Sequence, residues 1–578
     1  MHFLLGNTGR SMAPNGMNLR RNLGGLGHLL AWNGPVVTLL GLALALSAGL
    51  LLIQLPPLDG VLVVLLVIVG VATLVEPMAG LVAAFFLGLL RAYLRTEVPQ
   101  VPAQIGQLFV ALTVAAWLAR GLARRNLRVP HAPLFLPLLV FFGAALISLW
   151  DAVDLSGYGV PELVKWAQIL LVFLFVIHIL TPSQAGMETR PTYRRLTWLL
   201  GALLVTGVFQ ASVGAWQFAL RGDGPDHFAI LSFGDRFYRA YGTFEQPNPY
   251  AGYVGMTLSL AIGVLIGTVG DRETWRHGDT ETPRRRDRET RMYTPSPCPP
   301  VPLSPCRLAG LTLCSLALVA VVIALGAALA MSWSRGAWLG FGVAMAVMAV
   351  ALPRQARRGL LLVAVLVAGG LSLYATGLVP PSVTARLTGF TEYVRFEDVR
   401  GVGINDANYA VIERLAHWQA ALEMFRHDLW TGVGLGCYEP AYADFALINW
   451  PIALGHAHNV YLNVAAETGL IGLIAYLLLW GAVFWQTWRA TRRARGLLRG
   501  VAIGLLGAWT HLSVHHLLDN LYVNNVHLHI GVMLGLLAFV VQWTANQRIG
   551  ESVNEQISKS ANQQICKSAN RPADQVAI

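Results

Sequence analysis

Charged residues are scarce in this chain. Of its 578 residues, 13% are Asp, Glu, Lys or Arg, against about 25% in an ordinary soluble protein. Hydrophobic residues make up 55% of the sequence, which excludes a soluble globular protein, an intrinsically disordered chain and a collagen-like fibre. The composition predicts an all-α polytopic membrane protein, and its apolar runs indicate about 12–14 transmembrane helices.

Cysteine is sparse as well. The five cysteines lie at positions 298, 306, 314, 437 and 566, and none of them forms a CxxC pair. This spacing favours neither a structural zinc site nor a disulfide framework. A dinucleotide-binding strand–turn–helix unit is also missing, because the glycine run GVGLG at 432–436 follows a predicted helix. We interpret that run as a close-packed turn.

Apolar runs that are candidates for crossing a bilayer recur along most of the sequence. They fall at 34–55, 60–75, 77–94, 104–119, 131–150, 161–181, 196–220, 249–269, 308–332, 336–352, 359–379, 459–484, 501–516 and 527–545. We group them into transmembrane regions at 31–194, 195–269, 308–379 and 459–545. The stretch 60–94 is ambiguous, because Glu76-Pro77 is consistent with a turn between two short spans or with a kink in one long helix.

Arginine clusters indicate the orientation. With 14 spans they all fall on one side of the membrane, and the positive-inside rule makes that side cytoplasmic, with both termini there. The clusters comprise Arg120, Arg124, Arg125, Arg128, Arg190, Arg194, Arg195, Arg284, Arg285, Arg286, Arg288, Arg291, Arg354, Arg357, Arg358, Arg489, Arg492, Arg493, Arg495 and Arg499. The net charge of +11 is therefore mostly a topology signal, and we expect a lipid bilayer and no nucleic acid as partner.

Two long loops are expected on the opposite, extracytoplasmic face, at 221–248 and 380–458. The second contains five arginines and nine acidic residues and is far longer than a simple connection between helices. We expect it to be partly helical and to carry function. Three further segments are expected to be flexible or disordered: the N-terminus at 1–30, a cytoplasmic insert at 270–307, and a tail at 546–578 that repeats with a period of eight residues.

Two arginines on the expected outer side are candidate functional residues. Arg335 lies in a turn between two spans and breaks the positive-inside pattern. Its guanidinium could hold a phosphate, or it could simply snorkel to water. Arg414 borders the apolar face of a predicted amphipathic helix at 408–427. For Arg414 the alternative is an ordinary ion pair with Glu413.

The strongest local feature is the sequence GHAHN at 455–459, where the outer loop enters a span. A neutral histidine is a good general base near pH 7. A His-x-His metal site is the alternative, but no cysteine or carboxylate lies close at ligand spacing. The last hairpin holds more histidines and one acid, which we interpret as polar packing, with a metal site or proton relay as the alternative. These residues are His511, His515, His516, Asp519, His527 and His529.

Several segments together resemble the O-antigen ligase and O-antigen polymerase superfamily. They are YGTFEQPN at 241–248, SRGAW at 334–338, Arg414 and Trp418 followed by TGVG at 431–434, and HNVYL at 458–462 followed by ETG at 467–469. The similarity covers roughly residues 195–485. It does not separate a polymerase from a lipid-core ligase or a protein O-glycosylating enzyme.

The resemblance implies a glycosyltransferase of the inner or plasma membrane, with its active site on the extracytoplasmic face. Such an enzyme moves a glycan from a polyprenyl-diphosphate carrier to a hydroxyl of a glycan, lipid or protein, without a cofactor or metal. His458 matches the family's essential histidine, as general base. Arg335 and Arg414 match its two essential arginines, which would hold the diphosphate. We expect this reaction to invert the anomeric centre, because attack comes from opposite the leaving group.

Further substrate contacts are expected from residues near these motifs. They are Asn248, Gln246, Asn459, Glu467, His456 and Trp338. His456 lies two residues before His458, so the sequence leaves open which imidazole is the base. A polytopic transporter or flippase for a polysaccharide is the alternative from another class of protein. It predicts internal repeats with broken helices, which the sequence does not display.

Overall fold

The computed structural model describes residues 56–97, 101–125, 132–181, 189–232, 235–278, 305–389, 398–405 and 408–569. The chain forms two compact units, residues 1–72 and residues 73–578. Of the first unit, the described part is most of helix α3 (Pro57–Val75). The predicted span at 34–55, the N-terminus at 1–30 and most of the insert at 270–307 lie outside the described residues.

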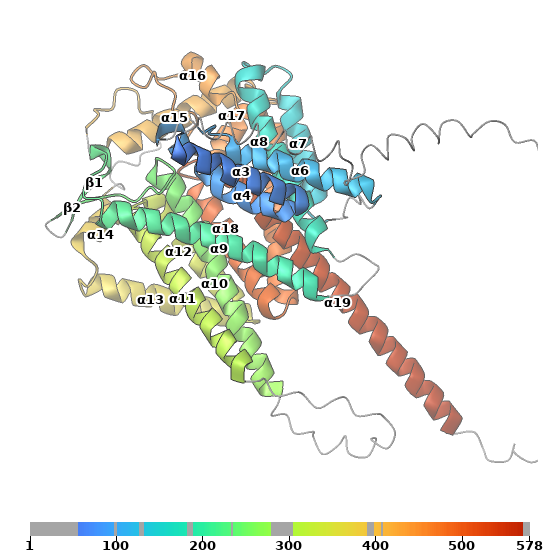
Figure 1. Cartoon of the computed structure of the whole chain (residues 1–578). Coiled ribbons are helices and arrows are strands. Elements are labelled where there is room, and N and C mark those ends of the chain that lie inside the picture. Colours follow the sequence, from blue (N-terminus) through green and yellow to red (C-terminus); the bar gives the residue numbers. More distant parts are fainter. Residues whose placement is uncertain are drawn as a thin grey trace, which may run out of the picture. The chain divides into compact units, whose positions relative to one another are not determined.

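The second unit is a bundle of helices with one small β-hairpin (Figure 1). Its first half contains α4 (Pro77–Leu89), α5 (Arg91–Glu97), α6 (Ile105–Ala123), α7 (Phe135–Ser148), α8 (Val160–Leu180), α9 (Thr189–Ala219), β1 (Ala229–Ser232), β2 (Asp235–Tyr238) and α10 (Pro247–Gly278). Its second half contains α11 (Pro305–Met331), α12 (Arg335–Ala351), α13 (Ala356–Ala375), α14 (Pro381–Thr388), α15 (Tyr409–His427), α16 (Tyr438–Phe445), α17 (Val460–Arg493), α18 (Gly496–His515) and α19 (Val526–Ala569).

Nine helices in the described residues are long and apolar enough to cross a membrane. A tenth results if α4 and α5, which are bent by 55° relative to each other, count as one span. The predicted class, an all-helical polytopic membrane protein, is confirmed. Of the remaining predicted spans, the one at 34–55 lies outside the described residues, and α7 and α12 have only 14 and 17 residues, against about 20 for a full crossing. Glu76 separates α3 from α4, so the stretch 60–94 is not one continuous helix.

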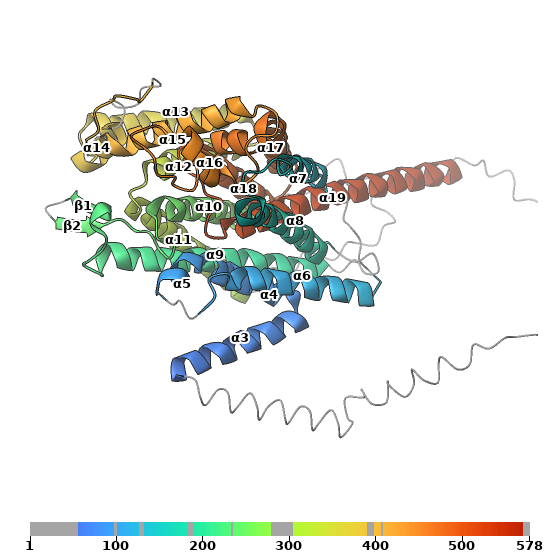
Figure 2. The same cartoon turned by 90° about the horizontal axis from the view of Figure 1, so that it is seen from above.

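Helices α10 and α18 pack against each other in the middle of the second unit (Figure 2). Of their apolar windows, 72% and 78% are buried. Glycines let the two backbones touch, since a Cβ on Gly263 would lie 2.4 Å from the carbonyl oxygen of Gly500. Close approach through small residues is a common way to stabilise helix pairs in a membrane. Because α12 also packs on α18, the first residue of α12, Arg335, is brought near the end of α18.

The two long loops contain local structure of their own. In the first, β1 and β2 pair antiparallel with Ala229 opposite Tyr238, a hairpin that the sequence analysis did not predict. In the second, α15 spans Tyr409–His427, which confirms that a helix lies at 408–427 as predicted. Helices α15 and α16 pack together and beside the N-terminal part of α17 (Figure 1).

Helix α17 is interrupted at Gly469, which has φ 61° and ψ −162°. The glycine turn at 431–434 lies against this break, and the N–H of Val433 donates to the carbonyl of Ala466 over 2.9 Å. A Cβ on Gly469 would lie 2.3 Å from the carbonyl of Trp430, so only glycine fits there. The TGVG and ETG segments are therefore packing partners, and the predicted close-packed turn is confirmed.

The C-terminal tail differs from its prediction. Residues 546–578 were expected to be disordered, whereas α19 continues as a helix to Ala569. The eight-residue repeats consist largely of Ala, Gln, Glu, Lys and Ser, with no proline before Pro572. Most of these residues favour a helix even without tertiary contacts, so a repetitive sequence of this composition can be helical.

Candidate active site

Three segments of the second unit meet beside the turn between α18 and α19. The N–H of Val460, at the start of α17, donates to the carbonyl of His516 over 2.9 Å. Nε of Arg414 donates to the carbonyl of Leu518 over 3.3 Å, which attaches α15 to the same turn. The start of α12 lies there too, because a Cβ on Gly336 would lie 3.0 Å from the ring of His515. The junction thus gathers three of the predicted motifs.

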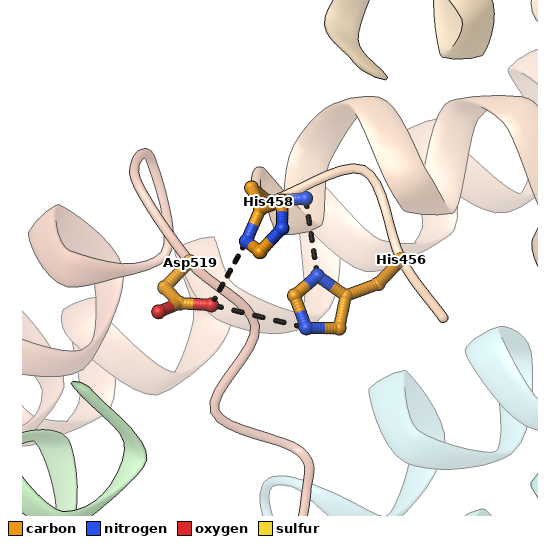
Figure 3. A group of neighbouring side chains, drawn as sticks. All are labelled: His456, His458 and Asp519. Atoms are coloured by element: carbon orange, nitrogen blue, oxygen red, sulfur yellow. Dashed lines mark hydrogen bonds and ion pairs between the residues drawn. The ribbon is translucent and has the colours of Figure 1, made fainter. Parts of the chain in front are cut away.

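His458 and Asp519 face each other across this junction (Figure 3). Nδ1 of His458 lies 3.5 Å from Oδ1 of Asp519, and Nε2 of His456 lies 3.8 Å from the same oxygen. The side chains are 17% exposed for each histidine and 7% for Asp519. The sequence analysis noticed Asp519 but assigned it to polar packing, because it lies far downstream of the histidines in the chain.

His456 supports the backbone of His458. His458 has φ 52°, a left-handed conformation that is unfavourable for a residue with a Cβ. Its N–H donates to Nδ1 of His456 over 3.1 Å (Figure 3). Burial, followed by the charge of His458, lowers the pKa of His456 to about 3, so this ring is neutral at pH 7. Because Nδ1 accepts a hydrogen bond, the single proton of the neutral ring lies on Nε2 and faces Asp519.

Asp519 keeps its negative charge although it is buried. Burial acts to raise the pKa of Asp519, but the neighbouring His458, His456 and Arg414 outweigh burial and hold that pKa below its usual range. A carboxylate at this place favours the tautomer of His458 with its proton on Nδ1. The lone pair is then on Nε2, which is buried and has no hydrogen-bond partner among the described residues. This nitrogen can accept the proton of a hydroxyl group.

A third imidazole lies behind the pair. The ring of His417, on α15, is 5.8 Å from that of His458, and its Nδ1 is 3.0 Å from the hydroxyl of Tyr438. Burial, with the charge of His458 added, lowers the pKa of His417 to about 4. His417 and His456 are both neutral and engaged by other groups, which leaves His458 as the best candidate base of the three.

Four arginines lie close to one another next to this histidine cluster: Arg239, Arg335, Arg386 and Arg414. They come from four separate segments, and because all four carry a positive charge they repel one another. Burial, followed by the charges of Arg386, Arg414 and Arg335, lowers the pKa of Arg239 to about 9. Burial, followed by the charges of Arg335 and Arg414, lowers the pKa of Arg386 to about 10. Concentrated and partly buried positive charge of this kind favours binding of a multivalent anion.

Two of these arginines also support the turn that carries Arg335. Nε of Arg239 donates to the carbonyl of Ser332 over 3.0 Å, and Nη2 of Arg386 donates to the carbonyl of Trp333 over 3.0 Å. Trp333 has a left-handed backbone with φ 53°, so the turn needs such support. Nε of Arg386 is buried without a hydrogen-bond partner among the described residues.

The sequence analysis missed Arg239 and Arg386. Arg239 closely precedes the YGTFEQPN segment, and both arginines lie in loops that were expected on the outer side. The rule that singled out Arg335, an arginine that breaks the positive-inside pattern, applies equally to these two positions and would have found them.

Asn248 and Gln246 differ in their surroundings. Oδ1 of Asn248 accepts hydrogen bonds from Oγ of Ser334 over 2.9 Å and from Nη2 of Arg239 over 3.2 Å. Asn248 therefore connects the YGTFEQPN segment to the turn before Arg335. Gln246 is exposed, and the structure gives its side chain no contact with the histidine cluster.

The remaining predicted contact residues have structural partners. Trp338 donates from Nε1 to the carbonyl of Leu329 over 3.0 Å. Asn459 caps α17, since its Oδ1 accepts from the N–H groups of the second and third residues of the helix. Oε1 of Glu467 accepts from the N–H of Tyr438 over 3.4 Å, at the start of α16. These contacts position helices around the site and leave no direct link to the histidines.

The histidine pair and Asp519 also resemble a possible metal site. Among the described residues, His456, His458 and Asp519 have potential ligand atoms within 4.8 Å of one another. A metal on Nε2 of His456 would require the ring proton on Nδ1, yet Nδ1 already accepts the backbone hydrogen bond from His458. The surrounding arginines oppose a cation as well. The hydrogen-bond network thus fits an acid–base pair better than a metal centre.

The other histidines of the last hairpin are buried between helices. Nε2 of His511 lies 3.2 Å from the carbonyl of Gly252, and Nε2 of His527 lies 2.8 Å from Oε1 of Gln168. These contacts agree with polar packing between helices.

Comparison with known proteins gives one match. A family model described as O-antigen ligase matches residues 319–477. The matched segment contains Arg335, Arg386, Arg414 and both histidines of the pair, whereas Arg239, Asn248 and Asp519 lie outside it. No curated protein matches the chain.

Proposed function

We propose that this chain, a multi-pass membrane protein with an O-antigen ligase domain at residues 319–477, transfers a glycan from a polyprenyl-diphosphate carrier to a hydroxyl acceptor. One observation carries the proposal: a histidine with an uncommitted ring nitrogen lies beside a buried carboxylate, and a group of four arginines lies next to that carboxylate. A base and an anion-binding site are the two elements that this reaction needs.

The reaction follows from these groups. Nε2 of His458 accepts the proton of the acceptor hydroxyl, and the oxygen attacks the anomeric carbon of the donor. The bond between that carbon and the diphosphate oxygen breaks, and the diphosphate leaves with the bonding electrons. Arg335 and Arg414 hold the diphosphate and stabilise the charge that develops on it. Attack from the face opposite the leaving group inverts the anomeric centre, and no step requires a metal or cofactor.

Asp519 is assigned the role of orienting the base. Its carboxylate faces Nδ1 of His458, holds the ring in one tautomer and stabilises the imidazolium that forms when the hydroxyl proton is taken up. At 3.5 Å the contact is longer than a strong hydrogen bond, and we expect it to shorten in the substrate complex. Removing the carboxylate should therefore slow the chemical step more than it weakens donor binding.

The position of the site along the helices supports an extracytoplasmic location. His458 precedes α17 and Arg335 begins α12, whereas Arg354, Arg492 and Arg499 gather at the opposite ends of α12 and α17. The positive-inside rule assigns that arginine-rich end to the cytoplasm. We therefore propose that donor and acceptor meet on the exported side of the inner or plasma membrane, with both termini cytoplasmic.

Glycan transfer by the purified full-length protein tests the proposal. The donor is a fluorescent polyprenyl-diphosphate oligosaccharide, and EDTA is present throughout. We expect a larger product or a glycosylated acceptor together with free polyprenyl diphosphate, and product size separates a polymerase from a ligase. If no donor yields product, while proteoliposomes move a polysaccharide equally well with wild type and His458→Ala, then a transporter replaces the enzyme.

A further inference from the structure

A cavity of about 710 Å³ lies beside α15, outside the histidine and arginine cluster. Its apolar wall includes Trp418, Leu422 and Phe445, and its polar rim includes Asp398, Arg400 and Glu423. This volume is within the range of about 300–1,000 Å³ that is usual for ligand pockets. None of the roles assigned above uses this cavity.

The polar groups of the rim are arranged as ion pairs. Nη2 of Arg400 lies 2.7 Å from Oδ2 of Asp398, and Nη1 of Arg426 lies 2.6 Å from Oε1 of Glu423. Paired charges leave a rim with many hydrogen-bond donors and acceptors but little net charge. Such a rim suits a neutral ligand with many hydroxyl groups better than an anion or a lipid tail.

Trp418 gives the cavity an aromatic wall. The side chain is only partly buried, so part of it is open to the cavity. A sugar that stacks its C–H face on this ring would gain the apolar contact that aromatic side chains provide.

Helix α15 carries residues of both the site and the cavity. Arg414 and Trp418 are four residues apart on this helix, so their side chains lie on one face about 5–6 Å apart. Leu462, on the first turn of α17 four residues after His458, also lines the cavity. A chain that begins at the diphosphate near Arg414 would therefore reach Trp418 within about one helical turn.

We propose that this cavity is a saccharide-binding subsite, which holds sugar residues next to the reacting centre. This inference rests on the proposed function for its substrate class, and it adds a binding site that the base and the arginines do not provide. The saccharide belongs either to the donor glycan or to a glycan acceptor, which offer the same chemistry to the cavity.

Binding of a labelled glycan to the full-length protein in detergent tests this proposal directly. The probe is the saccharide released by mild acid from the total polyprenyl-diphosphate-linked pool of the source cells, labelled at its reducing end. Trp418→Ala should weaken its binding roughly tenfold, and Trp418→Phe should retain most of it. Binding of polyprenyl diphosphate without sugar should be unchanged in both variants.

A matched pair of exposed isoleucines provides the control for folding. Ile448 lines the cavity and is 88% exposed, whereas Ile452 is 73% exposed and does not line it. Ile448→Arg should weaken glycan binding and Ile452→Arg should not. Equal binding by Ile448→Arg, Trp418→Ala and wild type would overturn the proposal. So would a loss that Ile452→Arg shares, or one that extends equally to the sugar-free carrier.

Kinetics then distinguish the donor from the acceptor and this inference from the proposed function. A raised KM for long donors alone assigns the cavity to the donor glycan, and a raised KM for glycan acceptors alone assigns it to the acceptor. If the cavity variants lose glycan binding but wild type transfers nothing, the proposed subsite is supported and the proposed glycan transfer is contradicted. If wild type transfers and the cavity variants match it in both binding and KM, the subsite fails alone.

Discussion

Arginines gather at both ends of α12 and α17, but they have different partners. At the end away from the site, Nη1 of Arg492 donates to the carbonyl of Pro353 over 2.6 Å, and Nη2 of Arg499 donates to that of Leu352 over 2.6 Å. The guanidinium of Arg492 also stacks 4.3 Å from the ring of Trp488. These groups satisfy the free carbonyls at the end of α12, as basic residues commonly do.

At the site end the arginines enclose other titratable groups. Arg239, Arg335, Arg386 and Arg414 lie close together next to a histidine and a carboxylate, and their like charges repel one another. The same residue type therefore caps helices at one end and forms an anion site at the other. The neighbouring groups decide which role an arginine has. Substitutions at the site end should therefore lower activity, and substitutions at the other end should lower stability.

The largest effect is expected from the arginines themselves. Arg335→Gln and Arg414→Gln should each lower kcat/KM for glycan transfer about 10²–10³-fold, because each removes a charge that stabilises the leaving diphosphate. Arg492→Gln, at the opposite end, should leave kcat/KM near wild type and lower Tm instead, since it removes hydrogen bonds to the carbonyl groups at the end of α12. A comparable loss of activity in Arg492→Gln with unchanged Tm would remove the distinction between the two ends.

A smaller loss is expected at the orienting carboxylate. Asp519→Asn keeps the size of the side chain but removes the charge that holds His458 in one tautomer, and kcat should fall about 100-fold. The KM for the donor should change little, because the arginines remain. A donor KM that rises in proportion while kcat is preserved would assign Asp519 to binding and not to orientation of the base.

His456 should have a weaker influence, through the backbone of His458. His456→Ala removes the acceptor of a single hydrogen bond and should lower kcat roughly three- to tenfold. His456→Asn places an oxygen near the position of Nδ1 and should restore most of the activity. If Asn is no better than Ala, the contact from His458 N–H to Nδ1 is not what supports the base.

The smallest effect concerns pH. His456 and His417 have pKa values lowered to about 3 and about 4, so neither gains a proton between pH 8 and pH 5. On the acid side, kcat at saturating donor should therefore fall with decreasing pH with a slope of one, because a single imidazole must be neutral. His417→Asn should leave this slope unchanged, and a slope of two in the wild type would implicate a second histidine.

Local patterns could be predicted from the sequence, whereas contacts between distant segments of the chain could not. The helix at 408–427 could be predicted because apolar residues recur at helical spacing, and α15 spans Tyr409–His427. The pairing of His458 with Asp519 depends on how α17 and α18 pack, and no spacing in the sequence encodes it. The hydrogen bond that engages His456 likewise depends on the left-handed backbone of His458.

The most direct test separates donor binding from chemistry. Donor affinity and release of polyprenyl diphosphate are measured on the same preparations of wild type, His458→Ala, Arg335→Gln and Arg492→Gln. We expect His458→Ala to bind donor as wild type does but to release about 10²–10⁴-fold less diphosphate. Arg335→Gln should lose binding and release together, and Arg492→Gln should lose neither. If His458→Ala releases diphosphate and transfers glycan at the wild-type rate, His458 is not the base and the central claim is wrong.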